Sequence, residues 1–510
     1  METKSAPNQL PQQRDDSGSR DVARPASSRL ASGRLIARNT AVQSAGMGAS
    51  RLASLVFYAV MARTLGKEAF GDFNFALSIG IFVTLSSLGT QYVVTREIAR
   101  DPERVHHLFW NSIAIRLVLG AIGVAVAVAV VEVTDYSATV RMAVAILAVA
   151  TWIDVLTQTV QAVFRGLEDM GPIGMSWTLQ RLFTAGVGSA LLLLGAGLIV
   201  ATLTYLGGSA FALVYISYRL VVRGVRPRLD LAWPRTRTLL VASIPLAIGN
   251  IFTMVLSRVD IIILSFMKSN AAVGIYGAAY ALFGGILFLP TMFGLSSYPA
   301  LSRLGRDTKP TIQEAYEKGC KAAMVALVPV GAVMILFAQR LTVFVYGSNF
   351  AQGDVPLRLL GASVPLYGLF LFSTFALAAW DRQRLVAVAM VVGGVVNVAL
   401  NLLLIPGHSY DGAAAAMTIS MIVVDLVVLA MVAAVIGDLG VGSAARVALG
   451  SVAGAGAMAA VVFAFGSGLA VIPVALAAYG VVVLVIERYL FPDDFAFLVR
   501  SVRGRFPVRA

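Results

Sequence analysis

The sequence predicts an all-α polytopic membrane protein with about fourteen transmembrane helices, and three observations lead to this fold class. Of the 510 residues, 58% are hydrophobic and 13% are charged, whereas roughly a quarter of the residues in a soluble domain are charged. The mean hydropathy of +0.81 leaves too few polar residues to cover so large an apolar core. About fourteen stretches between charged and Gly/Pro clusters reach the roughly 20 residues that cross a bilayer.

The expected spans divide the chain into two lobes of six helices and a final pair. We place the spans near residues 41–62, 73–94, 110–131, 142–163, 173–194, 198–218, 239–264, 275–296, 322–338, 359–380, 385–405, 413–436, 447–466 and 469–486. They give an N-lobe over 39–218, a basic cytoplasmic linker over 219–238, a C-lobe over 239–436 and the last two spans within 437–490. The polar segment 1–38 is expected to be a disordered cytoplasmic tail, and 491–510 a second cytoplasmic tail.

Positive charge predicts the orientation of these spans. With the N-terminus in the cytoplasm, most Lys and Arg residues fall in cytoplasmic loops, as the positive-inside rule requires. The linker carries the densest cluster, formed by Arg219, Arg223, Arg226, Arg228, Arg235 and Arg237. We therefore expect a multi-pass protein of the cytoplasmic (inner) cell membrane with both termini in the cytoplasm. The longest outer loop, 339–358, is too short for a catalytic domain, so the function is expected to lie between the helices.

A short motif recurs in the two lobes. Ala69, Gly71, Phe73 and Ala76 of "AFGDFNFA" return 203 residues later as Ala272, Gly274, Tyr276 and Ala279 of "AVGIYGAA". Each copy lies between the first and second span of its lobe. The equal offset predicts a parallel repeat, which is the architecture of transporters whose two lobes rock about a central cavity.

Ionisable side chains inside the spans are the first candidates for a site, because each costs roughly 2.5–3.5 kcal/mol on insertion scales. They are the arginines Arg51, Arg116, Arg181 and Arg258 and the aspartates Asp154, Asp260 and Asp425. One interpretation is a cavity in which arginines hold a phosphate or carboxylate and an aspartate carries a coupling proton or cation. The alternative is snorkelling or internal pairing. Arg258 and Asp260 diverge on one helix and are expected to have different partners.

Two pairs of amide side chains each lie on one helix face. Asn397 and Asn401 are four residues apart in the eleventh span, and Gln158 and Gln161 are three apart in the fourth. Hydrogen bonding between helices explains both pairs as well as sugar binding does.

Several classes of function are excluded by what the sequence lacks. It has no P-loop, HExxH, GxSxG or strand-borne GxGxxG motif, so we expect no enzyme, no catalytic residue and no cofactor. The single cysteine, Cys320, and three histidines make a metal centre remote. The basic charges lie in membrane-flanking loops, which argues against nucleic acid as a partner.

Five stretches resemble the polysaccharide flippases (O-antigen and exopolysaccharide translocases) of the multidrug/oligosaccharidyl-lipid/polysaccharide exporter superfamily. "MARTLGKEAFGDFNFALSIGIFVTLSSLG" (61–89) is similar to the family's first hairpin, and "SRVDIIILSFMKSNAAVGIYGAAYAL" (257–282) to its seventh span and the following loop. "VYGSNF" (345–350), "NVALNLLLIP" (397–406) and "GAAAAMT" (412–418) fit the region of spans nine to twelve. The likeness covers nearly all of residues 38–490.

The resemblance implies two lobes around a V-shaped cavity and outward translocation of an undecaprenyl-diphosphate-linked oligosaccharide for lipopolysaccharide or exopolysaccharide biosynthesis. Arg51 and Arg258 fall where the family's cationic cavity residues would lie, and we assign them, with Arg181 and Arg116, to the head group. Asp260, Asp154, Asp425, Asn397 and Asn401 are candidates for coupling or for polar groups of the cavity. Membrane lipids and the polysaccharide polymerase or export machinery are the expected partners.

Other functions stay open from the sequence. A drug/cation antiporter of the same superfamily would favour acidic cavity residues over arginines, and a lipid II flippase is another relative. A membrane-embedded glycan polymerase or ligase would need a large outer loop. A passive scaffold in a polysaccharide synthesis complex is the remaining alternative.

Overall fold

The computed structural model describes residues 26–225, 229–304, 309–437, 441–492 and 495, and every regular element within these ranges is a helix. Ten stretches of the described residues are long and apolar enough to cross a membrane. The all-α, polytopic membrane fold class is confirmed. The count of about fourteen spans stays a prediction, because some of these stretches contain more than one expected span.

The first half of the chain runs from α1 to α8. α1 reverses direction at Gly66, whose φ of 80° is one that glycine adopts readily, so two expected spans begin on one numbered helix. The elements of this half are α1 (Ala26–Ile79), α2 (Ile81–Thr84), η1 (Leu85–Ser87), α3 (Thr90–Arg100), η2 (Pro102–Arg104), α4 (Val105–Glu132), α5 (Ala138–Gly166), α6 (Gly171–Phe183), the π-helical turn η3 (Thr184–Gly188), α7 (Ser189–Leu193) and α8 (Leu198–Val222).

The second half runs from α9 to α17. α15 turns back at Ser409, where φ is 51° and ψ −130°, so it too holds two expected spans. The elements are α9 (Trp233–Met267), α10 (Asn270–Ile286), α11 (Phe288–Leu304), α12 (Lys309–Leu336), α13 (Ala338–Tyr346), η4 (Ser348–Gly353), α14 (Asp354–Ala379), α15 (Gln383–Ile436), α16 (Val441–Phe465), η5 (Leu469–Val471) and α17 (Ile472–Leu490).

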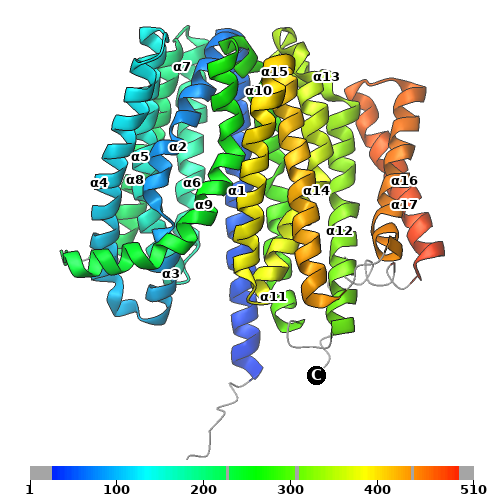
Figure 1. Cartoon of the computed structure of the whole chain (residues 1–510), viewed down its shortest axis with the longest axis horizontal. Coiled ribbons are helices and arrows are strands. Elements are labelled where there is room, and N and C mark those ends of the chain that lie inside the picture. Colours follow the sequence, from blue (N-terminus) through cyan, green and yellow to red (C-terminus); the bar gives the residue numbers. More distant parts are fainter. Residues whose placement is uncertain (1–25, 226–228, 305–308, 438–440, 493–494, 496–510) are drawn as a thin grey trace, which may run out of the picture.

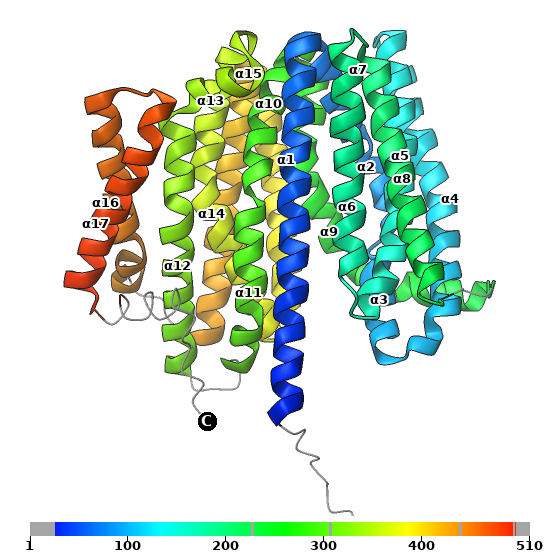
Figure 2. The same ribbon diagram turned by 180° about the vertical axis from the view of Figure 1, so that it is seen from behind.

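The two halves stand side by side (Figure 1). Helices α2 to α8 gather on one side and α10 to α15 on the other, with α1 and α9 between them (Figures 1 and 2). The pair α16 and α17 lies outside this arrangement against α12. We call the end where α1 begins the lower end and the opposite end the upper end. The domain boundaries that we expected at residues 39, 219, 239 and 437 stay predictions.

The structure describes the chain from the first residue of α1. α1 starts at Ala26, so residues 26–38 belong to a helix, and the tail expected over 1–38 stays a prediction. This segment is rich in Ala, Leu and Arg, which are among the strongest helix formers. Residues 1–25 lie outside the described residues, as does nearly all of the segment 491–510.

The segment between α8 and α9 is short and is bound to the first half. α8 extends to Val222 and α9 begins at Trp233, and Arg226 and Arg228 lie outside the described residues. Asn111 on α4 donates to the carbonyl of Asp230 at 2.9 Å and accepts from Ala232 N at 3.2 Å and from the hydroxyl of Thr236 at 2.5 Å. α9 then runs along the lower end of the first half before rising between the halves to pack on α15 (Figure 1).

The two copies of the repeated motif touch each other where α1 packs on α10. A Cβ on Gly71 would lie 1.9 Å from the carbonyl oxygen of Asn270, and one on Gly274 would lie 1.9 Å from that of Lys67. Lys67 and Asn270 differ by the same 203 residues as the two glycines, so the contact is symmetric under the repeat. Only glycine allows this approach of the two backbones.

Further contacts join the halves at the upper end. The rings of Tyr346 and Phe350 lie 5.9 and 5.8 Å from that of Phe70. Hydrogen bonds run from Arg63 to the carbonyls of Phe344 and Val345, from Asn270 Nδ2 to Asp72 Oδ1 at 2.6 Å, and between the hydroxyl groups of Tyr136 and Ser265 at 2.5 Å. The upper end is therefore closed between the halves.

The last helix pair is held to α12 by a buried ion pair. Lys321 Nζ lies 2.7 Å from Glu487 Oε2, and both side chains are almost wholly buried. The ammonium also lies 3.9 Å from the centroid of the Phe491 ring. Higher up α12, the hydroxyl of Tyr479 donates to the carbonyl of Val325 at 2.9 Å.

We expect Gly71→Ala to open the upper end. Overpacking of this kind costs roughly 1–3 kcal/mol, so the closed arrangement should lose population. In a Cys320→Ala background, Ser54→Cys in the space between the halves should react severalfold faster with a membrane-impermeant maleimide added on the upper side. Gly48→Ala is the matched control, because a Cβ there meets nothing within 4 Å. An unchanged rate in Gly71→Ala would contradict the role of this contact.

We expect Glu487→Ala to lower the midpoint of thermal unfolding in detergent, because loss of one partner of a buried ion pair costs roughly 3–5 kcal/mol. The pair of Lys318 and Glu314, 2.5 Å apart on α12 with the Glu314 side chain exposed, supplies the control. Glu314→Ala should cost less than about 1 kcal/mol. Equal effects of the two variants would show that burial of the Lys321–Glu487 pair does not matter.

Candidate functional site

A cavity of about 520 Å³ lies between the two halves and is lined by residues of α1, α2, α5, α6, α8, α9 and α10. On α1, the lining residues lie within 47–58, before the turn at Gly66, and within 74–78, after Gly71. On α10 they lie within 277–285, after Gly274. The cavity is therefore on the lower side of the contact between the two glycines. We call it the central cavity.

Three of the four arginines predicted for the site line this cavity. Arg51 comes from α1, Arg181 from α6 and Arg258 from α9. In the described part of the chain, none of them forms an ion pair with a carboxylate. Arg51 is close enough to Arg181 and Arg258 for their charges to repel. The cavity thus concentrates positive charge from both halves of the protein.

Two polar side chains of the first half, Tyr205 and Asp154, interact with Arg181. Its guanidinium carbon lies 5.1 Å from the centroid of the Tyr205 ring, a cation–π distance. Asp154 on α5 also lines the cavity, but its carboxylate accepts a hydrogen bond from Gln180 Nε2 at 2.8 Å. The same Gln180 nitrogen donates to Ser209 Oγ at 2.9 Å. Asp154 is therefore held in place by the wall of the cavity and offsets part of the charge of Arg181.

Arg116, the fourth predicted arginine, does not line the central cavity. It is fully buried on α4 and donates from Nη2 to Thr90 Oγ1 at 3.0 Å and to Gln91 Oε1 at 2.9 Å. Its Nη1 donates to the carbonyl of Val155. Its hydrogen bonds tie α4 to α3 and α5 and satisfy its donors within the protein. The assignment of Arg116 to the head group stays a prediction.

The polar candidates of the second half also lie away from the cavity lining. Asp260 is buried and accepts from the hydroxyl of Tyr276 and from Ile261 N at 2.8 Å. Asn401 donates to Asn397 Oδ1 at 3.1 Å, and Asn397 donates to Ser420 Oγ at 3.3 Å across the two arms of α15. These contacts match the helix-to-helix hydrogen bonding that we had left open for the asparagine pair.

Asp425 is a further buried carboxylate of the second half. It lies on α15 with 4% of its surface exposed. Its Oδ2 has no hydrogen-bond partner among the described residues. A role of Asp154, Asp260, Asp425, Asn397 or Asn401 in coupling stays a prediction.

Sequence reasoning missed several neutral polar residues of the cavity. Tyr58, Asn74 and Tyr280 all line it. Asn74 lies in the first copy of the repeated motif and corresponds to Gly277 in the second, and Tyr280 directly follows the second copy. The repeat could therefore have pointed to them, because equivalent positions near an axis between two lobes face the same space.

The chain belongs to the family described as polysaccharide biosynthesis protein, because residues 36–305, more than half of its length, match the profile of that family. The membership expected from the five stretches is confirmed. Two relatives come from Haloferax volcanii. The probable flippase AglR is 28% identical over 179 residues, which cover 34% of this chain and 37% of that protein. The probable low-salt glycan biosynthesis flippase Agl15 is 22% identical, with 71% of this chain and 76% of that protein covered.

The fold is similar to two kinds of solved transporter. A structure of the lipid II flippase MurJ in an inward closed conformation has a TM-score of 0.72 and 15% identity, covering 88% of this chain and 99% of that one. An inward-facing multidrug resistance MATE family transporter of the MOP superfamily has a TM-score of 0.64 and 15% identity, covering 78% and 98%. At these identities the likeness shows the fold alone.

We expect Arg116→Leu to destabilise the protein rather than act on a ligand. The variant leaves Thr90, Gln91 and the carbonyl of Val155 without their donor, and each unsatisfied buried group costs roughly 1–3 kcal/mol. The midpoint of thermal unfolding in detergent should fall by several degrees. Arg258→Gln in the cavity should leave the midpoint nearly unchanged. A midpoint of Arg116→Leu equal to that of the wild type would refute this structural role.

Proposed function

We propose that this protein is a flippase that moves a lipid-linked oligosaccharide from the cytoplasmic to the outer leaflet for the biosynthesis of cell-surface polysaccharide. The observation that carries this proposal is the central cavity, in which Arg51, Arg181 and Arg258 face one space and form no ion pair with a carboxylate of the described residues. The flippases among its relatives support it. The head group would carry a diphosphate on an undecaprenyl chain.

The physical problem that such a cavity solves is desolvation. A diphosphate carries at least two negative charges, and an isolated ion costs tens of kcal/mol in a medium of low dielectric. A guanidinium group offers a planar fork of donors that fits phosphate oxygens. Three of them in one cavity replace the water that the head group loses. The polyprenyl tail would stay in the lipid.

The positive charge of the cavity favours an anionic lipid head group over the cationic substrate of a multidrug antiporter. A cationic drug would require carboxylates facing the cavity. Of the aspartates predicted for the site, Asp154 lines the cavity and already accepts from Gln180. The three arginines come from both halves, so an anion between them would contact both halves at once.

The closed upper end supports transport by alternating access to one central site. With the predicted orientation, the lower end faces the cytoplasm and the cavity lies on the side from which the substrate is loaded. We propose the inner membrane as its location, with both termini cytoplasmic and a polymerase or exporter of the polysaccharide as functional partner. We propose no covalent step. Asp425, with one free carboxylate oxygen among the described residues, is the first candidate for a coupling proton or cation.

We expect Arg51→Gln, Arg181→Gln and Arg258→Gln each to slow flipping. A charge-assisted hydrogen bond contributes roughly 1.5–3 kcal/mol, or about ten- to a hundredfold in rate. The measurement is the initial rate at which purified protein in liposomes flips a fluorescent undecaprenyl-diphosphate oligosaccharide.

The control is Arg382→Gln, an exposed arginine between α14 and α15 that does not line the cavity. Full rates in all three cavity variants would disprove the arginine-lined pathway. Absence of flipping by the wild type, together with export of a cationic dye down a proton or sodium gradient, would favour the multidrug antiporter instead.

A further inference from the structure

A second cavity, of about 450 Å³, lies within the first half, between α3, α5 and α6. Its volume is within the roughly 300–1,000 Å³ that is usual for small-molecule sites. Gln158 on α5 and Trp177 on α6 line both this cavity and the central one. The two spaces are therefore neighbours that share these two side chains.

Three helices bring the lining residues of the second cavity together. On α5, Gln158, Gln161 and Arg165 are three and four residues apart and share one face of the helix. At the residue after Arg165, α5 packs closely on α3. A Cβ on Gly166 would lie 2.7 Å from Ile98 Cβ. α3 contributes Gln91, Tyr92, Thr95 and Arg96, and α6 contributes Trp177.

The lining has the chemistry of a sugar site. Amide side chains donate and accept at once, which suits hydroxyl groups that do both, and Gln91, Gln158 and Gln161 supply three of them. Gln161 also donates to Ser176 Oγ at 3.1 Å and is fixed in place by that bond. The rings of Trp177 and Tyr92 each have an apolar face and one polar group. The apolar face can pack on a pyranose ring while the polar group hydrogen-bonds to its hydroxyl groups.

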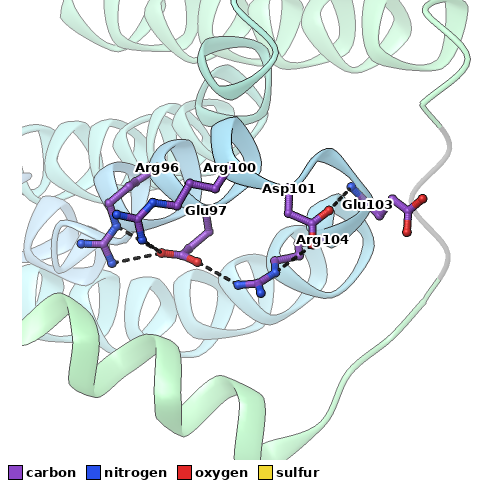
Figure 3. Close-up of polar contacts among 6 residues, drawn as sticks. All are labelled: Arg96, Glu97, Arg100, Asp101, Glu103 and Arg104. Carbon is purple, nitrogen blue, oxygen red and sulfur yellow. Dashed lines mark hydrogen bonds and ion pairs between the residues drawn. The ribbon is translucent and has the colours of Figure 1, made fainter. Parts of the chain in front are cut away.

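The charge of the cavity rests on Arg165. Arg96 is committed to Glu97, whose carboxylate lies 3.1 Å from its Nη2 and also pairs with Arg100 and Arg104 (Figure 3). Arg165 is partly buried and forms no ion pair within the ranges that the structure describes. A partly buried guanidinium without a counterion favours an anionic group beside the sugar.

We propose that the second cavity binds sugar residues of the transported head group and that Arg165 pairs with an acidic substituent of one of them, such as a uronate. This inference rests on the proposed function. The diphosphate would lie among the arginines of the central cavity while the first sugars pass between Gln158 and Trp177. The second cavity would thereby select acidic over neutral glycans.

The test compares two fluorescent undecaprenyl-diphosphate trisaccharides that differ only in one hexose, which is a hexuronic acid in the acidic member. In liposomes, Arg165→Gln should flip the acidic lipid roughly tenfold more slowly than the wild type and the neutral lipid at the wild-type rate. Arg165→Lys, which keeps the charge and loses the planar fork, should fall between them. Arg100→Gln, at the same end and outside the cavity, should change neither rate.

A second measurement separates this inference from the proposed function. The tryptophan fluorescence of the purified full chain is titrated with the lipid-free acidic and neutral trisaccharides. A saturable change with the acidic sugar that is lost in Trp177→Phe and weakened in Arg165→Gln is expected. If the wild type flips both lipids and Arg165→Gln slows both equally, or slows neither, the inference is overturned. Sugar binding without any flipping would instead overturn the proposed function.

Discussion

The close approach of two glycines, one from each copy of the repeat, is the constraint on which the rest of the structure depends. Gly71 and Gly274 let backbone carbonyls of the opposite half come within a distance that any side chain would forbid. With the halves in contact at this level, the helices α1, α9 and α10 diverge below it and leave the central cavity. The position of the contact along α1 and α10 therefore determines on which side the arginines are accessible.

The same fold is found in transporters that are named for different substrates. The similar solved structures include a lipid II flippase and a multidrug transporter, so the arrangement of helices does not identify a substrate. The choice lies in a few side chains that face the space between the halves. Here guanidinium groups from α1, α6 and α9 converge, and the carboxylate of Asp154 is held by its neighbours. A head group with dispersed negative charge satisfies donors from both halves at once.

Most of the charged residues that line the cavity could be predicted from the sequence. A charged side chain in a membrane is costly, so each one within a span must face a cavity or a polar partner. That reasoning found Arg51, Arg181, Arg258 and Asp154. It could not separate them from Arg116, because a threonine, a glutamine and a carbonyl satisfy a guanidinium as well as a cavity does. The neutral residues Tyr58 and Gln180 were missed because a neutral polar side chain costs little to place in a membrane. Its presence within a span therefore does not indicate a cavity. The second cavity depends on three helices meeting, which no single stretch of sequence records.

The attachment of α9 has a mechanical consequence. Its first turns are bound to α4 through Asn111 and its last turns pack on α15, so one continuous helix joins the two halves at both of its ends. If the halves rotate against each other, as the proposed alternating access requires, this helix must bend or give up one of its two contacts. α9 thus couples the position of one half to that of the other.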